Sequence, residues 1–309
     1  MPESATTAVP RPCRQRLLLA MKGFCMGAAD VVPGVSGGTI ALILGIYQQL
    51  IEAIRSFDSL WLKAIIHVNV REVRGRPHFG FILPLFAGIL AALVFFTRVV
   101  PLPALIESHP EQVYGLFFGL IAGSIMILLV NFRPQRMTLL ALTLGMLVGL
   151  WIFTRVPAET PDAAWFIFLS GMLAISAMLL PGISGSFILL LMKKYSAVFG
   201  AIGTFNLAVL LPFFAGVLTG LILFSRLLSW LLRRFYANTL AVIIGLLLAS
   251  LWIIWPFQLR IYATIADKTK MIGSNPVLPD PGLASTWQAV GLMLLGIISV
   301  LLLERLARK

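Results

Sequence analysis

A Pro-Gly-x-Ser-Gly motif occurs twice in this 309-residue chain, and its residue types suit the binding of an anion. Proline removes a backbone donor and glycine disfavours helix, so both copies should break the apolar helices that contain them. A helix that restarts after the break presents free backbone N–H groups and the positive end of its dipole, while serine and threonine hydroxyls add donors. We therefore predict a binding site for a phosphate or carboxylate, formed by Gly34, Ser36, Gly37, Gly38, Thr39, Gly182, Ser184, Gly185 and Ser186.

The simpler interpretation of each motif is a kink, or close helix packing through small residues. Two copies, Pro33 to Thr39 and Pro181 to Ser186, make a two-part binding site the better interpretation. A broken helix inside a bilayer is tolerated only when the break is buried in protein or lines a cavity, because unpaired backbone groups are costly there.

Four charged residues near the motifs are candidates for further roles. Asp30 lies well inside the first apolar run, whereas Met178 takes its place in the second copy. An intramembrane carboxylate is by default a functional candidate, so Asp30 could couple transport to a proton or cation. It could equally cap backbone N–H groups near the break. Lys22, Lys193 and Lys194 could guide an anionic head group, although Lys22 also suits a topology marker and the lysine pair could snorkel to the interface.

The composition is that of a polytopic membrane protein. Hydrophobic residues make up 59% of the chain, charged residues 12%, and the mean hydropathy is +0.97. The net charge of +12 comes from short basic segments between apolar runs, which indicates topology rather than nucleic-acid binding. No His-Glu-x-x-His, Walker motif or cluster of carboxylates and histidines is present, so we predict no catalytic residues, no metal and no cofactor.

The apolar runs divide into full spans and broken hairpins. Six are long enough to cross a membrane: 80–100, 113–130, 137–154, 207–226, 238–256 and 285–303. The runs that carry the motifs, 17–54 and 163–203, have arms of about 15 residues, or roughly 22 Å, which is short for a crossing. We predict two re-entrant hairpins, although fully crossing pairs would give the same sidedness. Residues 1–16 are predicted to be a disordered tail.

An internal repeat connects these elements. Residues 83–90 match residues 211–218 at six of eight positions, with an offset of 128, whereas the Gly-rich motifs are 148 apart. A basic insert around Arg71 to Gly80 absorbs the difference. Each half, 17–154 and 163–309, is therefore a hairpin followed by three spans. Because three is odd, the halves should enter the membrane from opposite sides, as in the inverted-topology repeats of secondary transporters. The predicted fold is an all-α polytopic membrane protein.

Charge fixes the predicted sidedness. If the N-terminus is cytoplasmic, 17 of the 24 Lys and Arg residues fall on the cytoplasmic side, as the positive-inside rule requires. Both termini are then cytoplasmic. The first hairpin enters from the cytoplasmic side and the second from the outer side.

Residues Lys22 to Thr39, KGFCMGAADVVPGVSGGT, resemble the signature of the bacterial polyprenyl-phosphate transporter family. The second motif and the Phe-Ala-Gly segments fit that family as well, so the resemblance covers nearly the whole chain. Lys193 and Lys194 depart from it, because the family is expected to have glycine or another non-basic residue there.

This resemblance implies a flippase in the bacterial cytoplasmic (inner) membrane. Its substrate would be undecaprenyl phosphate or another polyprenyl phosphate, returned to the cytoplasmic leaflet for cell-wall and surface-polymer synthesis. Its partners would be membrane lipid and a coupling proton or cation. Three alternatives stay open at this stage: a small-anion channel or exchanger, a lipid-phosphate enzyme, and a structural scaffold for a membrane complex.

Overall fold

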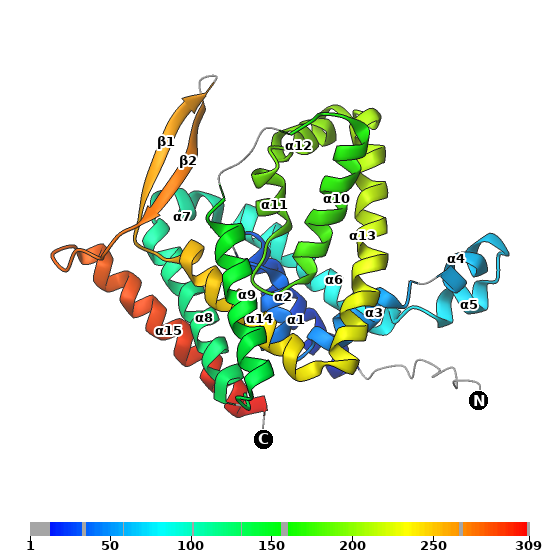
Figure 1. Ribbon diagram of the computed structural model, residues 1–309, viewed down its shortest axis with the longest axis horizontal. Helices are drawn as coiled ribbons and strands as arrows, with labels where there is room; N and C mark the ends of the chain where they lie inside the picture. Colours follow the sequence, from blue (N-terminus) through cyan, green and yellow to red (C-terminus); the bar gives the residue numbers. More distant parts are fainter. Residues whose placement is uncertain are drawn as a thin grey trace. The chain divides into compact units, whose positions relative to one another are not determined.

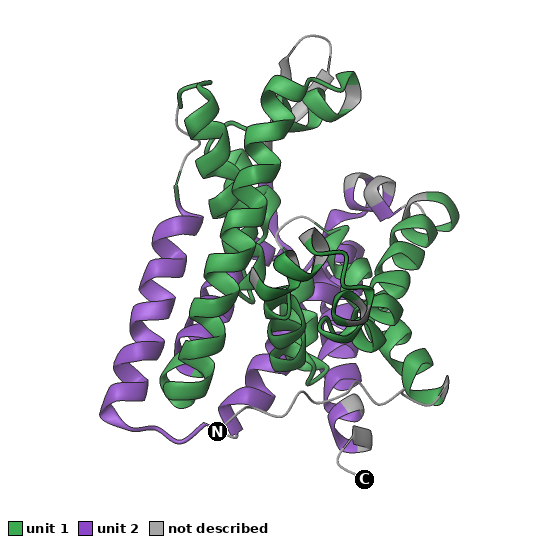
Figure 2. Cartoon of the chain, turned by 90° about the vertical axis from the view of Figure 1, so that its right-hand side faces the viewer, with its two compact units in different colours: residues 1–100, 155–240 green, residues 101–154, 241–309 purple. Residues whose placement is uncertain are grey.

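The structure is a computed structural model that describes residues 13–32, 35–57, 59–100, 102–130, 132–155, 160–265 and 268–307. Nearly all of the described elements are helices (Figure 1). Contacts group the chain into two compact units (Figure 2), each assembled from both halves of the sequence. Unit 1 is Met1–Val100 with Arg155–Leu240, and unit 2 is Pro101–Thr154 with Ala241–Lys309.

Unit 1 begins with the first broken hairpin and the helix that packs on it. Its elements are α1 (Cys13–Asp30), α2 (Gly37–Ile43), α3 (Tyr47–Arg55), α4 (Ser59–Ile66), α5 (Val70–Gly75), α6 (Phe79–Val94) and the π-helical turn η1 (Phe95–Val99). Helix α1 starts inside the predicted tail 1–16, whose residues 1–12 lie outside the described residues. Helices α1 and α6 cross where Gly23 and Gly88 let the backbones touch. A Cβ on Gly88 would overlap the Ala20 carbonyl oxygen.

The second half of unit 1 repeats this packing. Its elements are α10 (Ala164–Leu179), α11 (Gly185–Leu191), α12 (Tyr195–Thr204) and α13 (Leu207–Arg234). Helix α10 packs on α13 through Gly171 and Gly216, which correspond to Gly23 and Gly88 at the offsets of 148 and 128. A Cβ on Gly216 would overlap the Phe168 carbonyl oxygen, the counterpart of the Ala20 contact. The repeat in the sequence is therefore also a repeat of contacts. The opposite insertion of the two halves stays a prediction.

Unit 2 holds the other long helices. Its elements are α7 (Leu102–Ser108), α8 (Pro110–Val130), α9 (Arg136–Phe153), most of α14 (Tyr236–Ile254), β1 (Gln258–Ile265), β2 (Lys268–Pro276) and α15 (Ala284–Ala307). Helix α8 packs along α15, and α9 meets α14 where Gly145 and Gly245 bring the backbones together. The antiparallel hairpin β1–β2 adds to the predicted all-α fold. The sequence feature that could have predicted this hairpin is the alternation of polar and apolar residues from Gln258 to Ile261.

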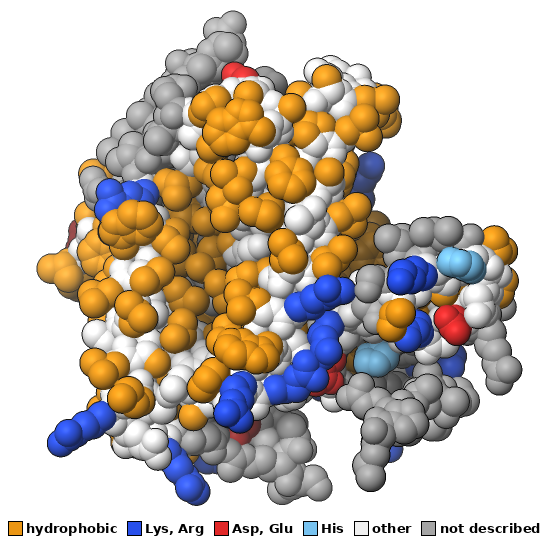
Figure 3. All heavy atoms as spheres, turned by 45° about the vertical axis from the view of Figure 1, so that its right-hand side comes forward, with side chains coloured by type: hydrophobic (Ala, Val, Ile, Leu, Met, Phe, Trp, Pro, Cys, Tyr) orange, Lys and Arg blue, Asp and Glu red, His pale blue; other side chains and the backbone are white. Residues whose placement is uncertain are grey.

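Helix length and apolar surface make this a multi-pass membrane protein. Within the described residues, α8, α9, α13, α14 and α15 are long and apolar enough to cross a membrane, and the bent pair α11–α12 would make a sixth span. Helix α13 exposes Leu211, Phe214 and Leu218, which repeat every three or four residues and so form one apolar stripe. Apolar side chains cover much of the upper and left part of the face in Figure 3. A surface of this kind needs lipid around it.

Both hairpins differ from the prediction in their second arm, which is two short helices instead of one. Helix α2 ends before Gly45 and α11 ends before Lys193, and these two positions are 148 residues apart. Both residues adopt the left-handed conformation, with φ of 68° and 53° respectively. The arm bends by 114° between α11 and α12. A left-handed residue cannot continue a right-handed helix, so the arm must restart in a new direction.

The corner at Gly45 supplies a stability test. Replacing Gly45 with alanine should cost about 1–2 kcal/mol, because a Cβ is strained at positive φ although no other atom lies within 4 Å of it. The measurement is the melting temperature of the purified protein in detergent. Gly200→Ala on α12 is the matched control, since its Cβ also meets open space and its φ is ordinary. Equal losses in both variants would contradict the assignment of the cost to backbone conformation.

Candidate anion site

The first Gly-rich turn is capped by side chains of the chain itself. Ser36 is the N-cap of α2, and its Oγ accepts a bond from the Gly38 N–H at 3.2 Å. The Asp30 carboxylate accepts a bond from the Gly37 N–H at 2.7 Å. Ser36 and Thr39 are 2% and 0% exposed. Asp30 thus makes the capping contact that was one of its two sequence interpretations, and its coupling role stays a prediction. Gly34 lies outside the described residues.

The second turn carries no such cap. Ser184 precedes α11 without a side-chain capping bond, and its Oγ lies 2.7 Å from the Ser186 Oγ. In the described part of the chain, Gly185 and Ser186 donate their backbone N–H groups to no other group. Met178, at the position of Asp30, offers no carboxylate to fill the place. The uncapped donors and two hydroxyls make the second turn the more available of the two for an anion.

The two turns touch one another within unit 1. The Gly182 N–H donates to the Thr39 Oγ1 at 2.9 Å, across 143 residues of sequence. Gly182 has a φ of 93°, a conformation that side chains other than hydrogen rarely adopt. The Tyr47 hydroxyl donates to the Leu179 carbonyl oxygen at 2.7 Å, just before the second turn. The structure therefore brings the two predicted halves of the site into direct contact.

Tyr47 is a site residue that the sequence analysis missed. It is 4% exposed and opens α3, where its ring and hydroxyl join the first hairpin to the end of α10. A signal was present, because Tyr195 occupies the same place in the second copy at the offset of 148. Tyr195 instead stacks on Phe199 with ring centroids 4.3 Å apart. The recurring tyrosine was visible in the sequence, but its role differs between the copies.

Side chains also satisfy the carbonyl before each left-handed corner. The Lys22 ammonium donates to the Leu44 carbonyl oxygen at 2.8 Å, at the end of α2. At the equivalent place after α11, the Thr160 hydroxyl donates to the Met192 carbonyl oxygen at 2.5 Å. Lys22 thus has a backbone partner inside the first hairpin. A carbonyl left unpaired there would cost several kcal/mol in a bilayer.

Lys194 is buried in an ion pair. Its side chain is 2% exposed, and its ammonium lies 2.5 Å from Asp162 and 3.0 Å from the Thr160 carbonyl oxygen. The Phe166 ring centroid is 5.7 Å from the same nitrogen. Lys193 forms the left-handed corner beside it. These contacts hold the segment before α10 against the corner between α11 and α12. Guidance of head groups by the three lysines stays a prediction.

The two turns present backbone N–H donors and hydroxyl groups. Among the described residues no three His, Cys, Asp or Glu side chains gather as metal ligands. Two broken hairpins in contact, inside a multi-pass helical protein, are an arrangement typical of membrane transporters that bind their substrate at discontinuous helices.

Comparison with known proteins identifies the family. The model of the VCA0040-like family, described as undecaprenyl phosphate translocase-like, matches residues 26–272. The chain belongs to this family, which comprises transporters rather than enzymes.

Two relatives carry the same printed name, polyprenyl-phosphate transporter. The Vibrio cholerae protein is 38% identical over 302 residues, covering 94% of this chain and 96% of the relative. The Staphylococcus aureus protein is 34% identical over 255 residues, covering 76% of this chain and 85% of the relative. No solved structure matches the chain.

The contact between the turns can be tested by removing its acceptor. Thr39→Val keeps the shape of the side chain but leaves the buried Gly182 N–H without a partner, which should cost about 1–3 kcal/mol. Thr219→Val is the matched control, because Thr219 is exposed on α13 and bonds only within its own helix. The measurement is again the melting temperature in detergent. A Thr39→Val variant as stable as Thr219→Val would argue against the contact.

Proposed function

We propose that this protein is a flippase for undecaprenyl phosphate, or another polyprenyl phosphate, in the bacterial cytoplasmic membrane. It returns the lipid carrier to the cytoplasmic leaflet for cell-wall and surface-polymer synthesis. Family membership and the printed names of two relatives support the substrate. The direct contact between two Gly-rich turns is the observation that carries the mechanism.

The chemistry of the site suits a lipid with one phosphate. The phosphate needs several donors away from water, whereas the polyprenyl tail can remain in the surrounding hydrocarbon. The second turn offers uncapped backbone N–H groups with the hydroxyls of Ser184 and Ser186. Charge-assisted hydrogen bonds to such donors are about twice as strong as neutral ones. A small polar site open to lipid at one side is sufficient for this cargo.

The first turn takes the phosphate in a second state. In the present arrangement Asp30 occupies the Gly37 N–H, so one carboxylate stands where a phosphate oxygen would bind. Protonation of Asp30, or its pairing with a cation, weakens this bond and frees the N–H donor of Gly37, next to the Gly38 N–H that Ser36 caps. The phosphate then exchanges with the carboxylate. This exchange would couple movement of the head group to a proton or cation.

The orientation follows from the charge distribution. Both termini and the first hairpin lie on the cytoplasmic side, and the second hairpin lies on the outer side. Lys22 and Lys193 attract anionic head groups to their hairpins, whereas Lys194 is buried in its ion pair with Asp162 and is left out of this role. The two turns then serve the two leaflets in alternation.

Bulky side chains in the turns should abolish transport. Gly37→Leu would push a Cβ to 2.6 Å from Asp30 Oδ2, and Gly185→Leu would push one to 2.8 Å from the Ala174 carbonyl oxygen. We expect a loss of at least about 100-fold in the transfer of a fluorescent polyprenyl phosphate across proteoliposomes, because a misplaced site costs that much. Gly200→Leu, on open surface, is the matched control.

A loss of transport is assigned to the turns only if membrane insertion and melting temperature of the Gly37 and Gly185 variants stay close to those of the control. Transport at the wild-type rate in both variants would remove the turns from the mechanism. Flux of chloride or another soluble anion into liposomes that contain no polyprenyl phosphate would favour the small-anion channel instead. Release of inorganic phosphate would favour an enzyme.

The coupling hypothesis has its own test. Asp30→Asn keeps an oxygen that can accept from Gly37 but removes the titratable charge. Transport by this variant should no longer respond to an imposed pH gradient or cation gradient. Asp280→Asn is the matched control, since Asp280 caps the Gly282 N–H at 2.9 Å in an exposed segment outside both hairpins. A gradient response that persists in Asp30→Asn would exclude this residue as the coupling group.

A further inference from the structure

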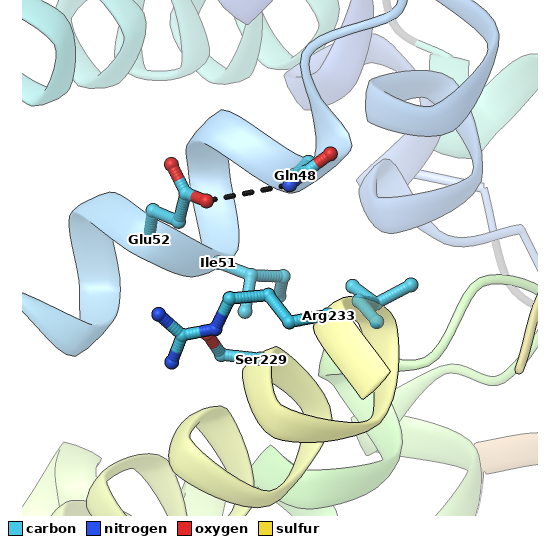
Figure 4. Close-up of a pocket in the computed structure, with 6 residues that line it drawn as sticks. Gln48, Ile51, Glu52, Ser229 and Arg233 are labelled. Carbon is cyan, nitrogen blue, oxygen red and sulfur yellow. Dashed lines mark hydrogen bonds between the residues drawn. The ribbon is translucent and has the colours of Figure 1, made fainter. Parts of the chain in front are cut away.

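A polar hollow lies between α3 and α13, away from the two turns (Figure 4). It is lined by Gln48, Ile51, Glu52, Ser229, Leu232 and Arg233. The side chains nearly close it, and almost none of its volume admits a water molecule. A ligand would therefore meet the polar groups at the exposed rim, where Arg233 lies, and not deep between the helices.

Arg233 lines this hollow and Arg55 contacts its lining residue Ser229, and among the described residues neither guanidinium has a carboxylate partner. Arg55 donates to the Ser229 Oγ at 3.5 Å, which is a long bond for so strong a donor. Arg233 has no hydrogen-bond or ion-pair partner among the described residues. Glu52 lies nearby but accepts from Gln48 at 3.4 Å. The two cations therefore keep most of their donors free.

Ser229 orients one of the two guanidiniums. It is 3% exposed, and among the described residues its hydroxyl accepts from Arg55 but donates to nothing. Two forked guanidiniums are groups that recognise a phosphate, because each can donate two parallel bonds to its oxygens. Glu52 is the one group at the rim that opposes an anion.

The internal repeat provides a comparison within the chain. The positions on α12 that correspond to Gln48, Glu52 and Arg55 at the offset of 148 are Ser196, Gly200 and Gly203. Helix α13 continues to Arg234, whereas its counterpart α6 ends at Val94. The charged hollow therefore belongs to one half only and is not a consequence of the repeated packing.

One wall of the hollow is helix α3, which also contacts the region of the second turn. Helix α3 begins at Tyr47, whose hydroxyl bonds to Leu179 beside the second turn. Arg55 is eight residues further on, a distance of about 12 Å along the helix axis. Lys and Arg side chains gather in one region of the face in Figure 3. Basic pockets at the ends of membrane helices bind anionic head groups in other proteins.

We propose that Arg55 and Arg233, with Ser229 orienting Arg55, form a second anion site, which binds a phosphate monoester at the membrane surface. The ligand is the head group of an anionic lipid or a free phosphate, and the shared phosphate chemistry is what the site recognises. If this site holds the lipid before transport, that role rests on the proposed function. Phosphate binding at the site is independent of the proposed function.

Binding can be measured apart from transport. The double variant Arg55→Gln/Arg233→Gln and the wild-type protein are each titrated with phosphatidic acid in phosphatidylcholine nanodiscs, with native mass spectrometry as the readout. The apparent affinity should fall by at least about tenfold in the double variant, because charged hydrogen bonds are lost. Arg234→Gln is the matched control, since Arg234 is the next residue on α13 and does not line the hollow. It should bind as the wild type does.

A variant that should raise the affinity distinguishes loss of the site from misfolding. Glu52→Gln removes the opposing charge and should raise the affinity for phosphatidic acid severalfold. Inorganic phosphate added as a competitor distinguishes the two sources of ligand: competition at millimolar concentration assigns free phosphate to the site, and none assigns the lipid head group. Equal binding by the wild type and the double variant would overturn the proposal, as would an equal loss in Arg234→Gln.

The same variants separate this proposal from the proposed function. If the wild type transports polyprenyl phosphate and the double variant still binds phosphatidic acid normally, the second site is wrong and the flippase stands. If the double variant loses binding while the wild type transports no polyprenyl phosphate, the second site stands and the flippase fails. If both hold, transport by the double variant should slow at low substrate density and recover at high density.

Discussion

The need to satisfy backbone groups at two broken helices governs this structure. A helix break in hydrocarbon exposes N–H and C=O groups that water cannot reach, and each costs several kcal/mol if unpaired. The protein supplies partners from its own side chains: Asp30 and Ser36 at the start of α2, Lys22 at its end, and Thr39 for the second turn. Residues that looked like separate functional candidates are thus first of all the groups that make the breaks possible.

Glycine packing holds the two broken hairpins in place. Helices α1 and α6 approach each other so closely that a Cβ at Gly88 would overlap a carbonyl oxygen, and α10 and α13 do the same at Gly216. Without a hydrophobic effect between helices in lipid, such close contact supplies much of the association energy. Each hairpin is therefore fixed to one long helix, and the turns can meet without being held by each other alone.

The two copies have diverged in chemistry while they kept their packing. The first turn carries a carboxylate on its N–H groups and the second presents uncapped donors and hydroxyls. The corners differ as well, with Gly45 in one copy and Lys193 beside a buried Lys194–Asp162 pair in the other. An alternating transporter needs two states of unequal energy that a ligand or ion can shift. Unlike turns in similar surroundings are a physical basis for such a pair of states.

The sequence by itself determined the membrane class, five of the six predicted spans, the two breaks and the repeat, because hydropathy, helix breakers and spacing are local properties of the chain. The predicted span 80–100 is instead the 16-residue helix α6 followed by the turn η1. It also singled out the residues of the two Gly-rich turns, although not Tyr47, which bonds beside the second turn. It did not determine that Asp30 bonds to Gly37, that Thr39 accepts from Gly182, or that Lys194 pairs with Asp162. Those partners lie 7, 143 and 32 residues apart, and the first two pairs meet only because α2 folds back on α1 and contacts α10. Which polar groups remain free for a phosphate was therefore decided by tertiary structure, since a donor's availability depends on what the fold has already bonded to it.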